Sequence, residues 1–262
     1  MIIDIHTHAW PDKIADKAKE TLEAFFKIKL CCLPTVNNLR ESMQKNNIDL
    51  SAICAVASRP DQVSSINDWL FKIRCKEIRV FCAMHPGYKL WKQELSRIKD
   101  NGDGIKFQPE FQDFYIDHPK PYPLYQEIER LGLPVLFHCG EELSGTMITR
   151  SSPDRVLTVK EKFPGLKLIA AHFGGFQLWD QVEKYLLGKD IYLDTAFLFG
   201  FLPQAKIREM LLRHPAQRLL FGTDFPLNDQ SKDLEAVRSL GLTQELLQRM
   251  LYLNSRELLG LD

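Results

Sequence analysis

The chain has 262 residues, a length near the upper limit for one hydrophobic core, and 45% of its residues are hydrophobic. Its 34 basic and 34 acidic residues give a formal net charge of zero, which argues against a partner held mainly by bulk charge, such as duplex nucleic acid or an anionic membrane. No apolar run approaches the roughly 20 residues that a membrane-spanning helix needs.

Short, strongly apolar runs alternate along the chain with longer segments of helical spacing. Continuous apolar runs are typical of parallel strands that are buried on both faces. In chain order, the predicted strands are Ile2–His6, Leu50–Ala57, Ile78–Met84, Gly104–Phe107, Pro134–His138, Leu166–Ala171, Asp190–Thr195 and Arg218–Gly222.

A helical segment follows each predicted strand. The predicted helices are Pro11–Lys29, Ser64–Arg74, Trp91–Lys99, Pro123–Leu131, Pro153–Phe163, Gln177–Leu187 and Pro203–Arg213, with further helices ending near Leu240 and Leu259. Eight such units of about 30 residues each predict an α/β fold, a single TIM (β/α)8 barrel domain over residues 1–262. A doubly wound open sheet usually carries a glycine-rich phosphate loop after its first strand, and this chain has His6-Thr7-His8 there.

Ionisable residues stand at the ends of the predicted strands. Two-residue periodicity is expected to send Ile3 and Ile5 to the helix layer and Asp4, His6 and His8 into the barrel. Strands four, five, six and eight end in Lys106, His138, His172 and Asp224. In a TIM barrel these ends converge at the C-terminal face, where active sites lie.

These residue types predict a metal centre. Two imidazoles two residues apart on one strand can share an ion, and a third imidazole with a carboxylate completes a ligand set suited to zinc or a similar divalent ion. Such an ion lowers the pKa of a bound water from about 16 towards about 7. A carboxylate beside the ion can accept the proton and deliver it to a leaving group.

Several motifs resemble the amidohydrolase superfamily, in the amidohydrolase-related branch that includes aminocarboxymuconate-semialdehyde decarboxylase. The family patterns D-x-H-x-H, G-x-K-h-x-P, G-x-P-h-x-H-x-G, H-x-G-G and G-T-D-x-P are similar, in order, to MIIDIHTH, GDGIKFQP, LGLPVLFHCG, LIAAHFGG and LLFGTDFP. The ending YLNSRELLGLD is similar to the family's tail. The resemblance covers nearly the whole chain and implies a metal-dependent TIM-barrel enzyme.

The resemblance implies a role for each of these residues. His6, His8, His138 and Asp224 surround the ion, and Asp224 is also a catalytic proton acceptor. His172 is a second catalytic residue, which activates or orients the water or acts on the substrate.

Lys106 bears on the number of ions. Binuclear members of the superfamily have a carboxylated lysine at this strand-four position, and it bridges two ions. In the amidohydrolase-related branch a lysine is common there without that role. We therefore predict one zinc ion per subunit, with Lys106 as a substrate-facing or structural lysine, and a binuclear site as the alternative if Lys106 is carboxylated.

Trp10 and Arg150 complete the candidate substrate-binding residues. Trp10 follows the histidine pair and can form a pocket wall or pack against a helix. Arg150, in the loop after strand five, can pair with a substrate carboxylate or remain solvated. Asp194, near the end of strand seven, is a weaker candidate for a substrate-binding or supporting group, and the aromatic-rich loop Glu110–Tyr115 can cover a substrate or pack over the barrel rim.

The cysteines and the first residues indicate the compartment. The chain has six cysteines without C-x-x-C spacing, and the segment Met1–His8 lacks the basic and apolar regions of a signal peptide. We therefore expect reduced thiols in a cytoplasmic protein. The sequence leaves a homodimer open.

Two enzyme functions fit these residues. The first is a metal-dependent hydrolase that cleaves an amide, ester or lactone of a small organic molecule with a metal-activated water. The alternative is a non-oxidative, metal-dependent decarboxylase of an unsaturated or aromatic acid. The chain is short for the decarboxylases and lacks a large substrate-covering insertion. A non-catalytic barrel is disfavoured because the predicted ligand set is intact.

Overall fold

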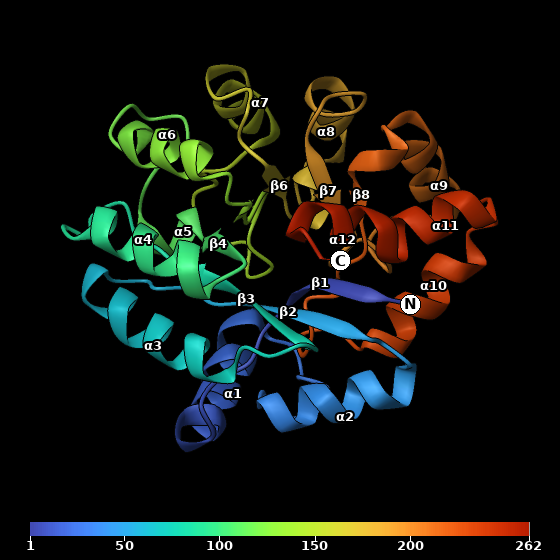
Figure 1. The fold of residues 1–262 in the computed structure, drawn as a ribbon. Coiled ribbons are helices and arrows are strands. Elements are labelled where there is room, and N and C mark those ends of the chain that lie inside the picture. Colours follow the sequence, from blue (N-terminus) through green and yellow to red (C-terminus); the bar gives the residue numbers. More distant parts are fainter. Residues whose placement is uncertain (262) are drawn as a thin grey trace.

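Eight parallel strands form one barrel in the computed structural model, which describes residues 1–261 (Figure 1). The strands are β1 (Ile3–Thr7), β2 (Leu50–Cys54), β3 (Ile78–Ala83), β4 (Gly104–Phe107), β5 (Val135–Phe137), β6 (Leu168–Ala170), β7 (Tyr192–Asp194) and β8 (Leu219–Leu220). Each strand pairs with the next one in the sequence. The backbone N–H of Ile5 donates to Phe221 O, which joins β1 to the end of β8. The predicted TIM barrel is confirmed.

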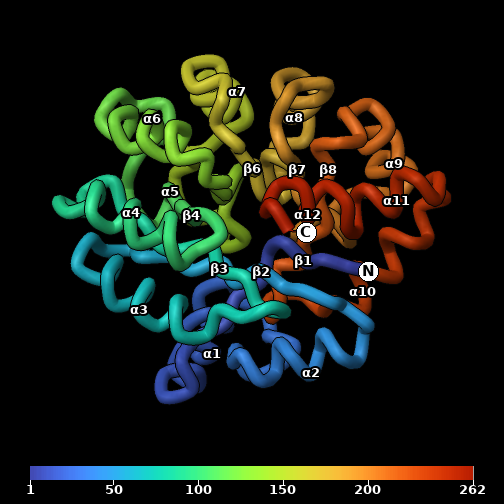
Figure 2. Tube along the Cα trace, in the orientation of Figure 1, coloured from blue at the N-terminus to red at the C-terminus, as the bar shows by residue number. Residues whose placement is uncertain are grey.

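Helices surround the barrel, as the tube in Figure 2 shows. They are α1 (Asp12–Phe26), α2 (Val36–Asn46), α3 (Val63–Ile73), α4 (Trp91–Asn101), α5 (Pro109–Gln112), α6 (Tyr122–Leu131), α7 (Pro153–Lys162), α8 (Trp179–Tyr185), α9 (Gln204–Arg213), α10 (Gln230–Ser239), α11 (Gln244–Gln248) and α12 (Asn254–Leu259). None of the helices in residues 1–261 has the length and apolar character needed to cross a membrane.

The helix α2 was not predicted. It begins after Thr35, whose side chain accepts a hydrogen bond from Asn38 N, and it ends at Asn47 in the left-handed conformation. Val36, Leu39 and Met43 have the spacing of a helix face, so the sequence carries a signal for α2 that the prediction overlooked. A TIM barrel needs one helix between consecutive strands, and α2 is the helix that leads into β2. The predicted helix α1 is therefore an additional element between β1 and β2.

The hydrophobic core has two parts on opposite faces of the strands. One part packs strand residues such as Ile105 and Val135 against the surrounding helices. The other contains the alternate positions of the strands, including Leu136 and Ile169, together with Leu258 of α12. The second part therefore fills the barrel interior below the polar residues described next.

The predicted alternation along β1 is wrong for Ile5 and Asp4. Ile5 packs in the interior cluster. Asp4 accepts hydrogen bonds from Thr223 and from Gln230 of α10. The pairing register between β1 and β2 shifts between Asp4 and Thr7, so an irregularity in the strand changes which side chains face inward.

Candidate active site

His6 lies within this irregular segment of β1, and His8 directly follows the strand. The hydrogen bond that each Nδ1 makes shows which ring nitrogen carries the proton. His6 Nδ1 lies 2.9 Å from Asp194 Oδ2, and His8 Nδ1 lies 2.6 Å from the carbonyl oxygen of Cys54. A carboxylate and a carbonyl only accept hydrogen bonds, so each Nδ1 carries the proton. In the neutral imidazole each Nε2 then presents a lone pair, which is the form that binds a metal.

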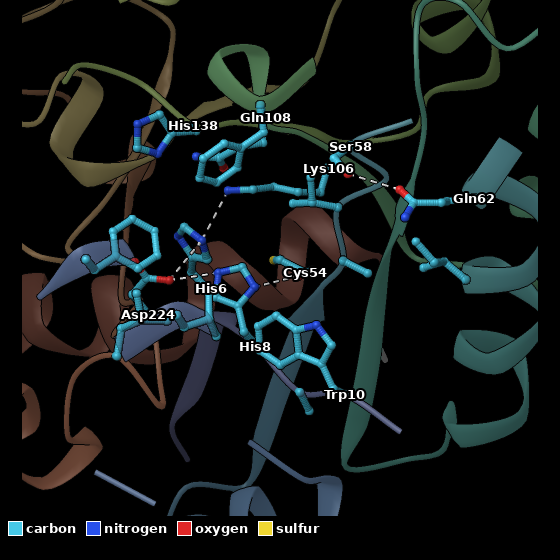
Figure 3. A pocket seen from close by; sticks show the side chains of 18 of the residues that line it. His6, His8, Trp10, Cys54, Ser58, Gln62, Lys106, Gln108, His138 and Asp224 are labelled. Atoms are coloured by element: carbon cyan, nitrogen blue, oxygen red, sulfur yellow. Dashed lines mark hydrogen bonds and ion pairs between the residues drawn. The ribbon is translucent and has the colours of Figure 1, made fainter. Parts of the chain in front are cut away.

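The carboxylate of Asp224 lies opposite these two lone pairs (Figure 3). Its Oδ1 is 2.8 Å from His8 Nε2 and 3.6 Å from His6 Nε2. This Oδ1 is buried and, among the described residues, accepts no hydrogen bond. Asp224 N donates to His6 O, so the backbone fixes the carboxylate beside β1. Three acceptor atoms thus converge without a proton between them, a repulsive arrangement that a divalent cation would relieve.

Burial sets the charge of the cluster. It lowers the pKa of His6 well below the usual value, and the nearby Lys106 lowers it further, so this imidazole is neutral. Burial works against the charged form of Asp224 as well. When protonated, the imidazoles of His6 and His8 carry a positive charge that outweighs burial and holds the pKa of this carboxyl below its usual range. Neutral imidazoles and an ionised carboxylate are the states that metal ligation requires.

Lys106 is fully buried, and its Nζ lies 3.2 Å from His6 Nε2. The ammonium group donates to the His6 lone pair and lines the cavity at the barrel mouth. In this position it competes with a cation for His6, and it also offers a positive charge to a substrate.

The imidazoles of His138 and His172 are joined by a hydrogen bond. His172 Nδ1 lies 3.2 Å from the carbonyl oxygen of Ala196, so that nitrogen carries the proton and Nε2 accepts from His138 Nδ1 at 3.0 Å. His138 Nε2 is then an unprotonated, buried nitrogen that makes no hydrogen bond within residues 1–261. Burial lowers the pKa values of both imidazoles. Of the pair, only His138 keeps a lone pair available for an ion.

Asp194, a weaker candidate from the sequence, accepts hydrogen bonds from His6 of β1 and from the turn that follows β6. Its Oδ2 accepts from His6 Nδ1, and its Oδ1 accepts from the backbone N–H groups of His172 and Ala196 at 2.8 and 3.2 Å. Burial raises the pKa of Asp194 to about 6. It orients His6 and the strand-six turn, as outer carboxylates do around metal ligands.

Glu142 is a functional candidate that the sequence interpretation missed. Its Oε1 lies 3.4 Å from His138 Nε2 and accepts from Gln108 Nε2 at 2.5 Å. Burial raises the pKa of Glu142 to about 7. The available signal was the pair Glu141-Glu142 directly after the strand-five motif HCG.

A cavity of about 750 Å³ opens at the barrel mouth. It is lined by all six predicted strand-end residues, His6, His8, Lys106, His138, His172 and Asp224. Trp10 also lines it, with its ring 6.1 Å from that of His8.

Arg150 is not brought into this cavity. Among residues 1–261, the cavity lining includes no arginine. Arg150 Nη2 instead pairs with Asp113 Oδ1 at 2.5 Å, and the guanidinium lies 5.8 Å from the centre of the Tyr115 ring.

Comparison with known proteins places this geometry in a family. The model of the amidohydrolase family matches residues 3–261. No curated protein matches the chain. Among solved structures, the chain is similar to 5-carboxyvanillate decarboxylase from Sphingomonas paucimobilis, with 13% identity, a TM-score of 0.74, and 100% and 99% of the two chains covered.

Two further structures extend the comparison. A putative 2-pyrone-4,6-dicarboxylic acid hydrolase from Pseudomonas putida shows 15% identity, a TM-score of 0.70, and 99% and 97% coverage. A dihydroxybenzoic acid decarboxylase from a Polaromonas species, with bound manganese and the inhibitor 2-nitroresorcinol, shows 15% identity, a TM-score of 0.71, and 99% and 97% coverage. At these identities the likeness concerns the fold. Since the family model spans nearly the whole chain, the protein belongs to the amidohydrolase family of metal-dependent enzymes.

Proposed function

We propose that the protein hydrolyses an ester, lactone or amide bond of a small organic molecule, with one zinc ion held by His6, His8, His138 and Asp224. The observation that carries the proposal is the convergence of His6 Nε2, His8 Nε2 and Asp224 Oδ1 without a proton between them. When bound, a divalent ion supplies acidity to a water molecule and polarises a carbonyl oxygen. Imidazole and carboxylate ligands with an open position favour zinc.

The hydrogen bond between His138 and His172 supports one ion rather than two. In a binuclear site both imidazoles turn a lone pair towards the second ion. Here His172 Nε2 already accepts from His138 Nδ1, and only His138 Nε2 is left. We therefore propose an unmodified Lys106 that faces the substrate.

Asp224 and His172 take different parts in the proposed reaction. The Asp224 carboxylate is ionised and accepts the proton of the attacking water, then passes it to the leaving group. His172 lines the cavity, and its ring centre lies 4.7 Å from that of His138. From there its Nε2 accepts the hydrogen bond of His138 Nδ1 and so orients His138 for the reaction.

Trp10 is proposed as a wall of the substrate site, because it lines the cavity beside His8. For Arg150 the contacts favour a structural role, because Asp113 and Tyr115 already hold its guanidinium.

The buried Lys106 supports the alternative function, a non-oxidative decarboxylase. Among residues 1–261 it is the one buried cationic side chain of the cavity lining. A buried ammonium beside His6 can hold the carboxylate of an aromatic or unsaturated acid. The two functions thus differ in whether Lys106 faces a carboxylate or the carbonyl of a neutral molecule.

Elemental analysis of the purified protein and a substrate screen test these proposals together. We expect about one zinc ion per subunit and turnover of lactones, esters or amides. Release of carbon dioxide from aromatic acids, with no hydrolysis, would favour the decarboxylase. Two ions per subunit would indicate a carboxylated Lys106.

A cytoplasmic location is also proposed. All six cysteines are free thiols, and three of them, Cys54, Cys82 and Cys139, are buried. Unpaired thiols are typical of a reducing compartment. Detection of the native protein in a fractionated cell extract tests this location.

A further inference from the structure

The cavity extends beyond the cluster of proposed metal ligands. Its volume of about 750 Å³ lies in the range of pockets that hold whole organic ligands. In Figure 3, Asp224 lies on one side of the cavity, and Trp10, Ser58 and Gln62 lie on the other. A substrate that reached only the ligand cluster would leave the far side of the cavity to water.

An apolar wall occupies this far side. We define it as the lining side chains Trp10, Ile14, Leu22, Phe26, Trp69 and Phe111. Helix α1 supplies three of them, and residues after β1 and on α3 and α5 supply the others. At one end Trp10 lies beside His8, and at another the rings of Phe26 and Phe111 are 6.4 Å apart. The wall therefore reaches a proposed metal ligand, His8, at Trp10.

Positive charge in the cavity is confined to one deep position and an exposed rim. Lys106 is buried beside His6, whereas Lys13 and Lys72 are exposed, and the lining formed by residues 1–261 includes no arginine. The buried side chains Asp224 and Glu142 add acidic groups to the interior. A second carboxylate on a substrate would find a cation only at the exposed rim, where solvent weakens the attraction, and deeper on the apolar wall it would be buried unpaired, which is costly.

From this arrangement we infer that the substrate is a neutral ester or lactone whose apolar chain or ring, several carbon atoms long, lies on the apolar wall. The inference rests on the proposed hydrolase function and adds the class of its substrate. Each methylene group buried on the wall is expected to raise affinity or kcat/KM by about fourfold, until the wall is covered. Dicarboxylate substrates are expected to be poor.

The test uses two matched series of probes with the metal-loaded protein. The first is a set of γ-lactones with side chains from methyl to heptyl, for which kcat/KM is measured. The second is a set of straight-chain alkyl hydroxamic acids, whose head group binds metals and whose binding is measured by calorimetry. We expect both kcat/KM and affinity to rise with chain length. Values that stay flat with length, or a preference for a dicarboxylate, would overturn the inference.

The two series separate this inference from the proposed reaction. If the hydroxamic acids bind more tightly with each added carbon and no lactone, ester or amide is cleaved, the apolar subsite stands and the hydrolase function fails. If short lactones are cleaved and neither measurement depends on length, the hydrolase function stands and the apolar subsite fails.

Phe26→Ser tests the wall itself. Helix α1 buries only Ala15, so this change at the cavity leaves the barrel core intact. We expect the ratio of heptyl to methyl lactone kcat/KM to fall about tenfold. Leu212→Ser is the matched control, because Leu212 is 52% exposed on α9 and does not line the cavity. A wild-type ratio in Phe26→Ser would overturn the assignment of α1 to the wall.

Discussion

The carboxyl groups of Asp224 and Asp4 are both buried beside strand β1, yet their partners are opposite in kind. Asp4 receives hydrogen bonds from the side chains of Thr223 and Gln230 and from two backbone N–H groups, and burial raises its pKa to about 7. Asp224 Oδ1 faces the imidazoles of His6 and His8, whose positive charge, when they are protonated, holds the pKa of this carboxyl below its usual range.

The comparison shows what distinguishes a ligand-binding cluster from a structural one. Donors satisfy the oxygens of Asp4, so this group has no need of an ion. The acceptors around Asp224 face one another instead. Asp233, near Asp4, belongs with the structural group, because its Oδ1 accepts from Asn228 and burial raises its pKa to about 8.

Removal of both β1 imidazoles is expected to have the largest effect. The double variant His6→Ala with His8→Ala loses two of the converging lone pairs, so its metal content should fall from about one ion per subunit to none, with turnover at background. Elemental analysis after gel filtration measures this loss. Full metal content in the double variant would mean that the site lies elsewhere.

Asp224→Asn compared with Asp4→Asn tests the contrast between the two carboxyl groups directly. An amide at position 224 cannot accept a proton, so we expect kcat to fall by a factor on the order of 10³–10⁴ and metal binding to weaken. An amide at position 4 disturbs satisfied hydrogen bonds and should cost about 1–3 kcal/mol of stability while metal content stays normal. Kinetics, elemental analysis and melting curves are measured on both variants. Equal metal loss in the two would mean that Asp224 and Asp4 do not differ in their role towards the metal.

His172→Asn should have a smaller effect than the loss of a ligand. His172 keeps no lone pair for an ion in the observed hydrogen-bond pattern, so the metal should remain while kcat falls by a factor on the order of 10²–10⁴. Metal content, melting temperature and kcat are measured on one preparation. Normal kcat with full metal contradicts the catalytic role, and metal loss in step with kcat points to a binuclear site.

The strand-end residues could be predicted from the sequence because two signals agree at each of them. At β5, for example, a continuous apolar run ends in His138 before Cys139-Gly140, and the barrel topology then brings such ends to one mouth. The TIM barrel itself could be predicted from eight successive strand–helix units.

The features that sequence reasoning missed depend on contacts between distant segments. The irregularity in β1 turns Ile5 inward, and strict alternation cannot reveal it. Helix α2 is an exception, because the spacing of Val36, Leu39 and Met43 could have been read from the sequence. Glu142 contacts His138, and Arg150 contacts Asp113, because of the conformation of the loop after β5. The sequence does not reveal that conformation.

The smallest effect concerns Asp233 and the pH dependence of stability. Its pKa is about 8 in the folded protein, whereas an unfolded aspartate titrates near pH 4. Between these values the folded state holds a proton that the unfolded state releases, so the contribution of Asp233 to stability is complete below about pH 4 and is lost as the pH rises to about 8. Asp233→Asn removes this slope.

The free energy of unfolding of Asp233→Asn relative to that of the wild type should therefore rise from pH 5 to pH 8, by up to about 1.4 kcal/mol per pH unit, and the difference in melting temperature should rise with it. Both proteins are measured without metal, because metal binding has its own pH dependence. Asp4 titrates in the same range and raises the pKa of Asp233, so the two curves are also compared in the Asp4→Asn background. Parallel curves would mean that Asp233 is ionised in the fold, and the contrast with Asp224 would then rest on hydrogen-bond donors alone.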